Sequence, residues 1–459
     1  MQNRSTICSL STASSGALAI VRMSGENALT VFAHLSNAKL KSHEAKLCQL
    51  VYQNELIDEA VVTFFEKGKS FTGEDTVEIT CHGSPYITQK LLEILNTCGA
   101  VPAQPGEFTM RAFLNGRMDL SQAEAVADLI ASESKAAHDI AINQMRGGFS
   151  NEIKQLREEL VNFASLIELE LDFAEEDVEF ADRKQLMELF EKINTGIEKL
   201  IASFEYGNAI KNGVPVAIVG APNVGKSTLL NVLLNEEKAI VSNIPGTTRD
   251  VIEDTLTIEG ILFRIIDTAG IRQNPDSEIE KIGIERTYEK IKQASLVLYL
   301  AVMDADWESN AETVHNAYEE AQKIQDKFPE KKVWLIGTKS DLIPKTTDAL
   351  LWPHKIPLLG ISAKTRQGID ALKHLMVEYV RKKEINYNTV VVTNVRHLAV
   401  LKKAHASLEA AKKGLLNQLS GDLVAMDIRA TIHYLGEITG TISTEDLLGN
   451  IFSKFCIGK

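Results

Sequence analysis

The chain has 459 residues, of which 24% are charged and 44% hydrophobic, values typical of a globular protein of roughly three domains and not of a disordered or fibrous one. The net charge of -13 disfavours general phosphate neutralisation as a way of binding nucleic acid, so a role on RNA requires a local basic patch or a second protein. Five cysteines without CxxC spacing disfavour a disulfide framework and a zinc site, and the lack of a run of about 18 apolar residues disfavours a membrane span, so we expect a cytoplasmic protein.

Residues 1–118 alternate short β-prone runs with glycine-containing turns. The runs are "ALAIVRM", "EAVVTFF" and "DTVEITCH", and one helix-like stretch, "YITQKLLEILNTCG", follows them. Apolar and polar residues alternating within short segments are typical of strands that have one buried face. This segment is therefore predicted to be a small α+β domain.

Two long tracts without proline are predicted to be helical, because proline inside a helix costs about 3 kcal/mol. In the first tract, apolar residues recur at helical spacing, and the second contains the helix-prone run "VRHLAVLKKAHASLEAAKKGLL". The residues of the first apolar face are Ile153, Leu156, Leu160, Phe163, Ile167 and Leu171. We predict one helical domain made of residues 119–211 and 379–459, interrupted by an insert at 212–378.

The insert opens with the most specific motif of the chain, "VPVAIVGAPNVGKSTLLNVLL". An apolar strand leads into Gly220, and Gly225, Lys226 and Ser227 follow directly before a helix, which is the P-loop pattern in its required context. Glycines let backbone N–H groups surround phosphates, Lys226 reaches the β and γ oxygens, and Ser227 holds Mg²⁺. The insert is predicted to bind a nucleoside triphosphate.

Further motifs appear in the order that a GTPase requires. The stretch "PGTTRD" offers Thr247 and Thr248 as a switch that closes on Mg²⁺ and the γ-phosphate. In "DTAG", Asp267 lies behind the metal and Gly270 acts as a pivot. GTP is the expected nucleotide because "TKSD" ends in Asp341, which can accept from two guanine N–H donors.

Other residues of the base-recognition motifs are also expected to contact guanine, and one position departs from the usual pattern. Lys339 is expected to pack on the base, and the backbone of Ser362, Ala363 and Lys364 in "ISAK" to meet the guanine carbonyl. Thr338 stands where asparagine is usual; asparagine can offer an amide donor to the base and brace the P-loop, whereas threonine has only a hydroxyl. Somewhat weaker nucleotide binding is expected, with specificity retained through Asp341.

The group that drives hydrolysis is left open by the motifs alone. Ile271 follows "DTAG" where Ras-like GTPases place a water-orienting glutamine, so another residue must orient the water. Asn223 in the P-loop is either a ligand of a monovalent cation between the β- and γ-phosphates or a simple spacer.

The whole chain resembles the MnmE (TrmE) family of tRNA modification GTPases. The matching stretches include "FTGEDTVEITCHG", "QPGEFTMRAFLNGRMDLSQAEAVADLI", "IEKIGIER" and the terminal "FCIGK". The resemblance implies an N-terminal α+β folate-binding and dimerisation domain, a discontinuous helical domain, and an inserted Ras-like α/β P-loop G domain. Two rivals are a ribosome-assembly type of RNA-binding switch and a one-carbon transferase regulated by its G domain.

The resemblance also implies a reaction and its participants. Together with an FAD-containing partner, MnmG, the protein would add a carboxymethylaminomethyl or aminomethyl group to C5 of wobble uridine 34 in certain tRNAs. Methylene-tetrahydrofolate would supply the one-carbon unit, with 5-formyl-tetrahydrofolate as an analogue. The implied assembly is a homodimer through the N-terminal domain, joined to MnmG as a heterotetramer, and pairing of the G domains would depend on GTP and potassium.

Individual site residues follow from the same resemblance. Glu280 would orient the attacking water, although a glutamate at that place is ordinarily a solvated surface residue. Ser227 and Thr248 would hold Mg²⁺, and K⁺ would be held by Asn223, Ser242, Ile244 and Thr247. Folate would be contacted by Arg22, Glu78, Arg117 and Lys459. The full GTP-binding set comprises Asn223, Val224, Gly225, Lys226, Ser227, Thr228, Ser242, Asn243, Ile244, Pro245, Gly246, Thr247, Thr248, Asp267, Thr268, Ala269, Gly270, Thr338, Lys339, Ser340, Asp341, Ser362, Ala363 and Lys364.

Cys456 lies in the terminal "KFCIGK". A terminal lysine disfavours a prenyl anchor, and a metal role lacks partner cysteines. Two alternatives stay open: the thiol takes part in the modification chemistry, or it belongs to a tail that is simply packed in place.

Overall fold

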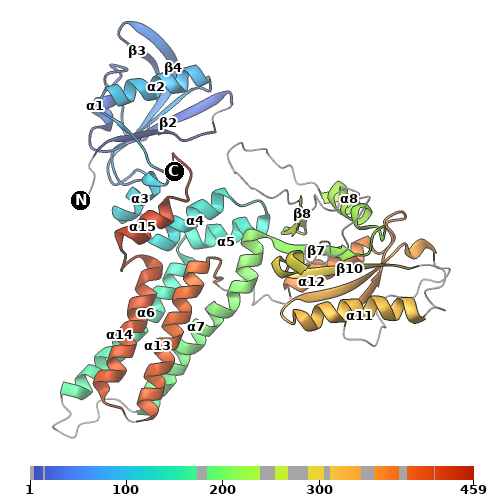
Figure 1. Ribbon diagram of the computed structural model, residues 1–459. Coiled ribbons are helices and arrows are strands. Elements are labelled where there is room, and N and C mark those ends of the chain that lie inside the picture. Colours follow the sequence, from blue (N-terminus) through green and yellow to red (C-terminus); the bar gives the residue numbers. More distant parts are fainter. Residues whose placement is uncertain are drawn as a thin grey trace. The chain divides into compact units, whose positions relative to one another are not determined.

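The computed structural model describes residues 5–13, 16–172, 183–237, 254–266, 288–303, 311–342, 356–381, 390–417 and 419–458 (Figure 1). The chain forms two compact units. The sheet-and-bundle unit comprises Met1–Ala131, Ala141–Glu198 and Ala399–Lys459, and the nucleotide unit comprises Ser132–Ile140 and Lys199–Leu398. The boundaries expected from proline placement stay predictions.

The N-terminal part of the sheet-and-bundle unit is a six-stranded mixed sheet of order β3-β4-β5-β2-β1-β6. All neighbouring strands are antiparallel except β1 and β6. The strands alternate buried and exposed residues, so that Val77, Ile79 and Cys81 of β5 face the core. The elements are β1 (Ile7–Leu10), β2 (Leu18–Ser24), α1 (Ala28–Phe32), β3 (Ala45–Tyr52), β4 (Glu55–Phe65), β5 (Thr76–His82), α2 (Pro85–Thr97) and β6 (Val101–Pro102).

Short helices continue the chain from this sheet. Helix α3 (Glu107–Leu114) is followed by α4 (Leu120–Ile130), which begins at a capping box in which Asp119 accepts from the backbone N–H of Gln122. Helix α15 (Glu445–Phe452) from the end of the chain lies against α3 (Figure 1). Residues of α3, α4 and α15 therefore share one small hydrophobic core.

Long helices run side by side as a bundle (Figure 1), which lies mostly in the same unit, although the unit boundaries at Glu198 and Ala399 fall within two of the helices. They are α6 (Gly148–Asp172), α7 (Arg183–Asn212), α13 (Val395–Leu416) and α14 (Gly421–Thr439), and the shorter α5 (Lys135–Met145) precedes them. The apolar face expected on α6 is confirmed from Ile153 to Ile167, whose five expected residues are buried. The side chain of Leu171 lies outside the described residues. Lys412 of α13 pairs with Glu191 of α7, and α14 lies against α6.

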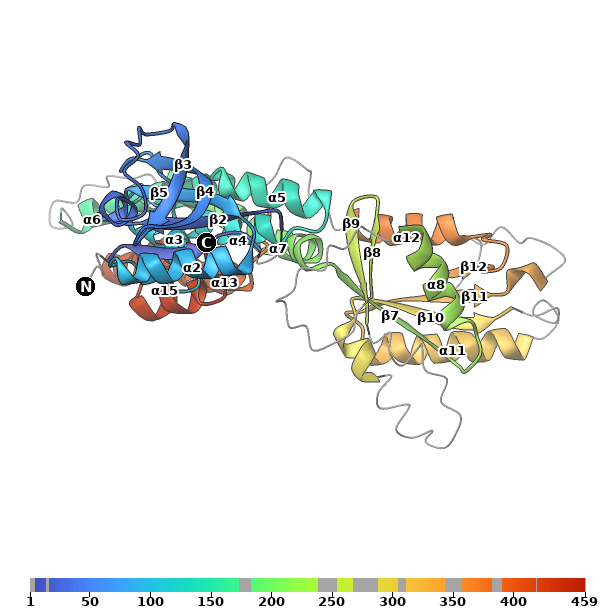
Figure 2. The same ribbon diagram turned by 90° about the horizontal axis from the view of Figure 1, so that it is seen from above.

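The nucleotide unit has a six-stranded sheet of order β12-β11-β10-β7-β9-β8, parallel except for the β8–β9 hairpin. Helices α8 and α12 pack on one face and α11 on the other (Figure 2), so both faces of the parallel strands are covered. The elements are β7 (Val214–Gly220), α8 (Lys226–Glu237), β8 (Asp254–Ile258), β9 (Ile261–Ile265), β10 (Leu296–Val302), α11 (Ala311–Lys327), β11 (Lys332–Thr338), η2 (Ser340–Leu342), β12 (Leu358–Gly360) and α12 (Ile369–Arg381). This is the α/β arrangement expected for a P-loop domain.

Within the described ranges, no helix combines the length and the apolar character needed to cross a membrane.

Candidate nucleotide and folate sites

The P-loop connects the carboxyl end of the central strand β7 to the start of α8. Gly220 has φ +144°, and a side chain there would meet the carbonyl oxygen of Leu300 on β10. Asn223 and Gly225 take φ values of 62° and 98°, in the left-handed region. Asparagine is one of the few non-glycine residues that adopt this conformation readily, so both positions suit a tight loop. The loop delivers the free N–H groups of the first turn of α8 to one place, which suits phosphate.

Lys226 is folded against this loop. Its Nζ donates to the carbonyl oxygens of Gly220 at 2.8 Å and Ala221 at 2.7 Å. Partial burial, followed by the charge of Lys290, lowers the pKa of Lys226. An ammonium group held beside the free N–H groups of α8 provides the positive charge that a phosphate chain requires.

Thr338, at the end of β11, braces the P-loop despite the absence of the usual asparagine. Its Oγ1 lies 2.7 Å from the carbonyl oxygen of Val224 and 3.1 Å from that of Ala301. A hydroxyl has one proton, and the shorter distance assigns it to Val224. Sequence reasoning recognised the substitution but not that the hydroxyl reaches the loop, which depends on two segments 114 residues apart.

Asp341, the residue predicted to recognise the base, is held by Ser362. The Ser362 hydroxyl donates to Asp341 Oδ1 at 2.6 Å, and it accepts from the backbone N–H of Thr365 at 3.2 Å. The hydrogen bond from Ser362 lowers the pKa of Asp341. An ionised carboxylate in a fixed orientation is the acceptor that the two guanine N–H groups require. The sequence predicted only a backbone role for Ser362, so this side-chain function was missed.

Several predicted GTP-site residues lie outside the described part of the chain. They are Ser242, Asn243, Ile244, Pro245, Gly246, Thr247, Thr248, Asp267, Thr268, Ala269, Gly270 and Glu280. The predicted water-orienting residue and most of the predicted potassium and magnesium ligands belong to this group. Among the described residues, no cluster of three or more His, Cys, Asp and Glu side chains is suited to a metal ion.

Two of the predicted folate residues are in direct contact in the N-terminal sheet. Arg22 on β2 lies opposite Glu78 on β5, and its Nε and Nη2 donate to Glu78 Oε1 at 2.9 and 2.8 Å. The guanidinium carbon lies 5.9 Å from the ring centroid of Phe71 and 5.6 Å from that of Phe108. Both distances fall within the range of a cation–π contact. The arrangement presents a charged pair beside two flat apolar rings.

Arg117 and the tail approach the same region from other elements. Arg117 Nη1 donates to the carbonyl oxygen of Gly68, in the loop that contains Phe71. Lys459 lies outside the described residues, but its neighbour Gly458 accepts from the Ser11 hydroxyl at 3.1 Å and packs on Leu10. Leu10 ends β1, the strand directly beside β2. The structure therefore joins Arg22 to Glu78 and holds Arg117 on the adjacent loop.

Cys456 is exposed, whereas Cys8, Cys48 and Cys81 are buried. The Cys456 carbonyl accepts from the Gly106 N–H at 3.3 Å, and the preceding ring of Phe455 lies 5.3 Å from that of Phe452. The backbone of the tail is thus packed in place while the thiol is left accessible.

Comparison with known proteins identifies the family. Residues 6–117 match the model for the GTP-binding protein TrmE N-terminus, and residues 120–456 match the model for the MnmE helical domain. The chain belongs to the MnmE family. A tRNA modification GTPase MnmE from Christiangramia forsetii is 51% identical, with 100% of both chains covered. Those from Flavobacterium psychrophilum and Bacteroides thetaiotaomicron are 50% and 47% identical, with 99% and 100% of both chains covered.

Solved structures also show similarity to part of this chain. The G domain of the FeoB iron transporter of T. maritima is 30% identical and covers 36% of this chain and 98% of its own, with a TM-score of 0.26. Full-length membership of the family, together with the P-loop motif and its strand-loop-helix context, makes this chain a GTPase.

Proposed function

We propose that this protein hydrolyses GTP to drive tRNA modification, and that with the FAD-containing partner MnmG it adds a carboxymethylaminomethyl or aminomethyl group at C5 of wobble uridine 34. The observation that carries the proposal is the collinear identity of about half of all residues with curated tRNA modification GTPases over the full chain. The fixed carboxylate of Asp341 supports guanine as the base.

The proposal includes a folate site in the N-terminal domain. The pair Arg22–Glu78, the rings of Phe71 and Phe108, Arg117 and the tail residue Lys459 would bind methylene-tetrahydrofolate as the one-carbon donor. A flat pterin suits stacking on aromatic rings, and Glu78 suits the N–H donors of the pterin while the basic groups suit carboxylates.

The proposed cycle also requires cations and assembly. Mg²⁺ would be held by Ser227 and Thr248, and K⁺ by Asn223, Ser242, Ile244 and Thr247. Pairing of two G domains would then bring Glu280 to the attacking water. The protein would act in the cytoplasm as a homodimer through its N-terminal domain, joined to MnmG, which would supply part of the tRNA contact because this chain is acidic.

The decisive experiment is nucleoside analysis of tRNA from cells that lack this protein, before and after the gene is restored. Loss of the C5 modification at position 34, regained with the wild-type gene but not with Lys226→Ala, is expected. An unchanged wobble uridine in the deletion strain would refute the proposed reaction.

The cation mechanism is tested separately by GTP turnover in matched potassium and sodium salts. Turnover is expected to be faster in potassium, because an ion of suitable size would neutralise charge between the β- and γ-phosphates. Equal rates would refute the role of K⁺ in hydrolysis but would not bear on the proposed tRNA reaction.

The role of Glu280 is tested by Glu280→Ala. This variant should hydrolyse GTP more slowly while its GTP affinity stays near that of the wild type, and lost affinity would show that Glu280 was misassigned.

A further inference from the structure

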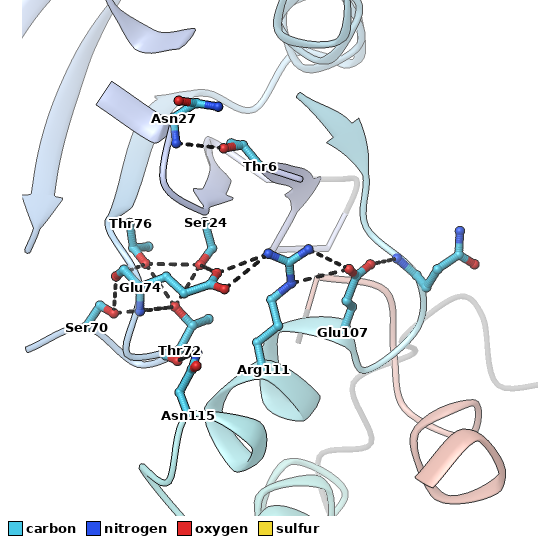
Figure 3. Close-up of polar contacts among 11 residues, drawn as sticks. Thr6, Ser24, Asn27, Ser70, Thr72, Glu74, Thr76, Glu107, Arg111 and Asn115 are labelled. Atoms are coloured by element: carbon cyan, nitrogen blue, oxygen red, sulfur yellow. Dashed lines mark hydrogen bonds and ion pairs between the residues drawn. The ribbon is translucent and has the colours of Figure 1, made fainter. Parts of the chain in front are cut away.

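Arg111 on α3 bridges two carboxylates that come from separate parts of the N-terminal domain (Figure 3). Its Nη1 donates to the two oxygens of Glu74 at 3.1 and 3.3 Å. Its Nη2 and Nε donate to Glu107 Oε1 at 2.9 and 3.3 Å. The Arg111 side chain is only 6% exposed, so the planar guanidinium is committed to these two partners.

Both carboxylates are themselves fixed to the backbone or to the sheet. Glu107 accepts from the backbone N–H of Gln104 at 2.8 Å, which sets the direction in which the chain enters α3. Glu74 accepts from the hydroxyl of Ser24 at 2.8 Å, and Ser24 is a fully buried residue of β2. The guanidinium therefore connects β2, the loop of residues 66–75 between β4 and β5, and the start of α3.

The same loop is held to the segment after α3 at two further points. Asn115 Nδ2 donates to the carbonyl oxygen of Thr72 at 2.8 Å, and Arg117 Nη1 donates to that of Gly68 at 2.9 Å. Gly73 has φ +79°, and a side chain there would lie 3.1 Å from Asn115 Cβ. The loop thus lies directly on the helical segment, and the contact of Arg111 is the buried charged part of that attachment.

The position of this loop determines the surroundings of Arg22. Phe71 belongs to the loop and Phe108 to α3, and their rings lie 5.9 and 5.6 Å from the Arg22 guanidinium. A shift of the loop relative to α3 would separate the two rings and move the anchor of Arg117. Arg22 itself is held by the sheet through Glu78.

Stability alone is a poor explanation for a buried charged bridge of this kind. Removing charges from water costs about as much as their attraction returns, and apolar replacements of buried ion pairs are often neutral or stabilising. A bidentate guanidinium does, however, fix the relative orientation of the groups that it joins. The bridge is therefore better explained by the groups whose relative orientation it fixes.

We propose that Arg111 is a positioning residue for the folate site, which it serves by locking the 66–75 loop to α3 so that Phe71 and Arg117 stay in place beside Arg22 and Glu78. The inference rests on the proposed function, because it assumes that these four residues bind folate. Arg111 acts through the loop and does not touch the ligand.

The test measures the affinity of the full-length protein for 5-formyl-tetrahydrofolate by calorimetry. Arg111→Lys keeps the charge but replaces the planar guanidinium by a single ammonium group, which cannot bind both carboxylates in the same way. Glu74→Gln weakens the bridge from its other end, and Glu93→Gln, the same change at an exposed position of α2 in the same domain, is the matched control. We expect Kd to rise about tenfold in both bridge variants, equivalent to about 1.4 kcal/mol, and to be unchanged in the control.

Limited trypsin digestion reports on the loop itself, because Lys67 and Lys69 are exposed within it. Cleavage after these two lysines should accelerate in Arg111→Lys and Glu74→Gln at temperatures well below the melting temperature of each variant, while cleavage elsewhere stays close to that of Glu93→Gln. Weaker folate binding together with faster loop cleavage supports the proposal.

Other outcomes separate the inference from the proposed function. Unchanged affinity in both bridge variants overturns the inference while leaving folate binding intact. Weaker binding without faster loop cleavage also overturns it, since Arg111 would then act by another route. If the wild-type protein binds no folate, the folate site itself fails, and faster loop cleavage would show that the bridge serves only the fold.

Discussion

The hydroxyl of Thr338 lies 2.7 Å from the carbonyl oxygen of Val224, so the end of strand β11 is tied directly to the P-loop. The residue is only 5% exposed. A buried carbonyl that loses its donor costs about 1–3 kcal/mol, and here that cost falls on the loop that binds phosphate. We therefore expect the strength of nucleotide binding to depend on this residue outside the P-loop.

Thr338→Val is therefore expected to weaken GDP binding about tenfold, because valine has nearly the same shape but leaves the Val224 carbonyl without its donor. Thr338→Ser keeps the hydroxyl and is the matched control, with affinity near that of the wild type. Fluorescence titration with a labelled GDP measures both. Equal affinities of the valine and serine variants would contradict the bracing role.

Ser362 is expected to determine the pH below which the affinity for guanine nucleotides falls. Its hydrogen bond lowers the pKa of Asp341 below the usual value of an aspartate, so the ionised form, which would accept from guanine, persists as pH falls until that lowered pKa is reached. Removing the donor in Ser362→Ala raises the pKa, and the loss of affinity should begin at a higher pH. The measurement is GDP affinity as a function of pH.

Asp341→Asn supplies the comparison for this titration, because an amide does not ionise. Asp341→Asn should bind GDP weakly at every pH, and its GDP affinity should show no fall at low pH that comes from protonation of residue 341. An acid limb that is identical in the wild type and Ser362→Ala would contradict the proposed hydrogen-bond effect.

Gly458 is expected to be essential for packing of the C-terminal tail. Its φ of +93° disfavours any side chain, and a Cβ would collide with the carbonyl oxygen of Leu10. Gly458→Ala should displace the tail at a cost of about 1–3 kcal/mol, seen as faster removal of the last residues by carboxypeptidase. Gly449→Ala is the control, because nothing lies within 4 Å of a Cβ there and alanine favours a helix. Equal digestion rates of the two variants would contradict this account.

The cysteines should differ sharply in reactivity. Burial raises the pKa of Cys8 and of Cys81 to about 11, so about one thiol in a thousand is ionised at pH 8, and neither side chain is accessible. Exposed Cys456 should be alkylated first by iodoacetamide, with Cys8 and Cys81 labelled only after denaturation. Peptide mass spectrometry measures the order, and early labelling of Cys8 would contradict the described core.

Local patterns predicted those parts of the molecule that depend on short sequence distances. Alternating residues in β5 and the apolar stripe of α6 both fold as their periods indicate. The P-loop strand and helix follow from "VGAPNVGKS" because the turn residues are specific.

Contacts between distant segments were not predictable in the same way. Glu74 and Arg111 are 37 residues apart, and nothing in either local sequence indicates that they meet. Residues 132–140 group with the nucleotide unit, where Ala136, Ala137 and Ile140 pack on its core. Their apolar character indicates burial but does not specify in which core.

The contact between the Ser11 hydroxyl and the Gly458 carbonyl joins residues 447 positions apart. During synthesis Ser11, directly after β1, is translated 447 residues before Gly458. The nascent chain can thus complete its sheet long before the tail exists to lie against it. The proposed folate site would therefore be complete only after the segment around Gly458 has been translated and has packed beside β1.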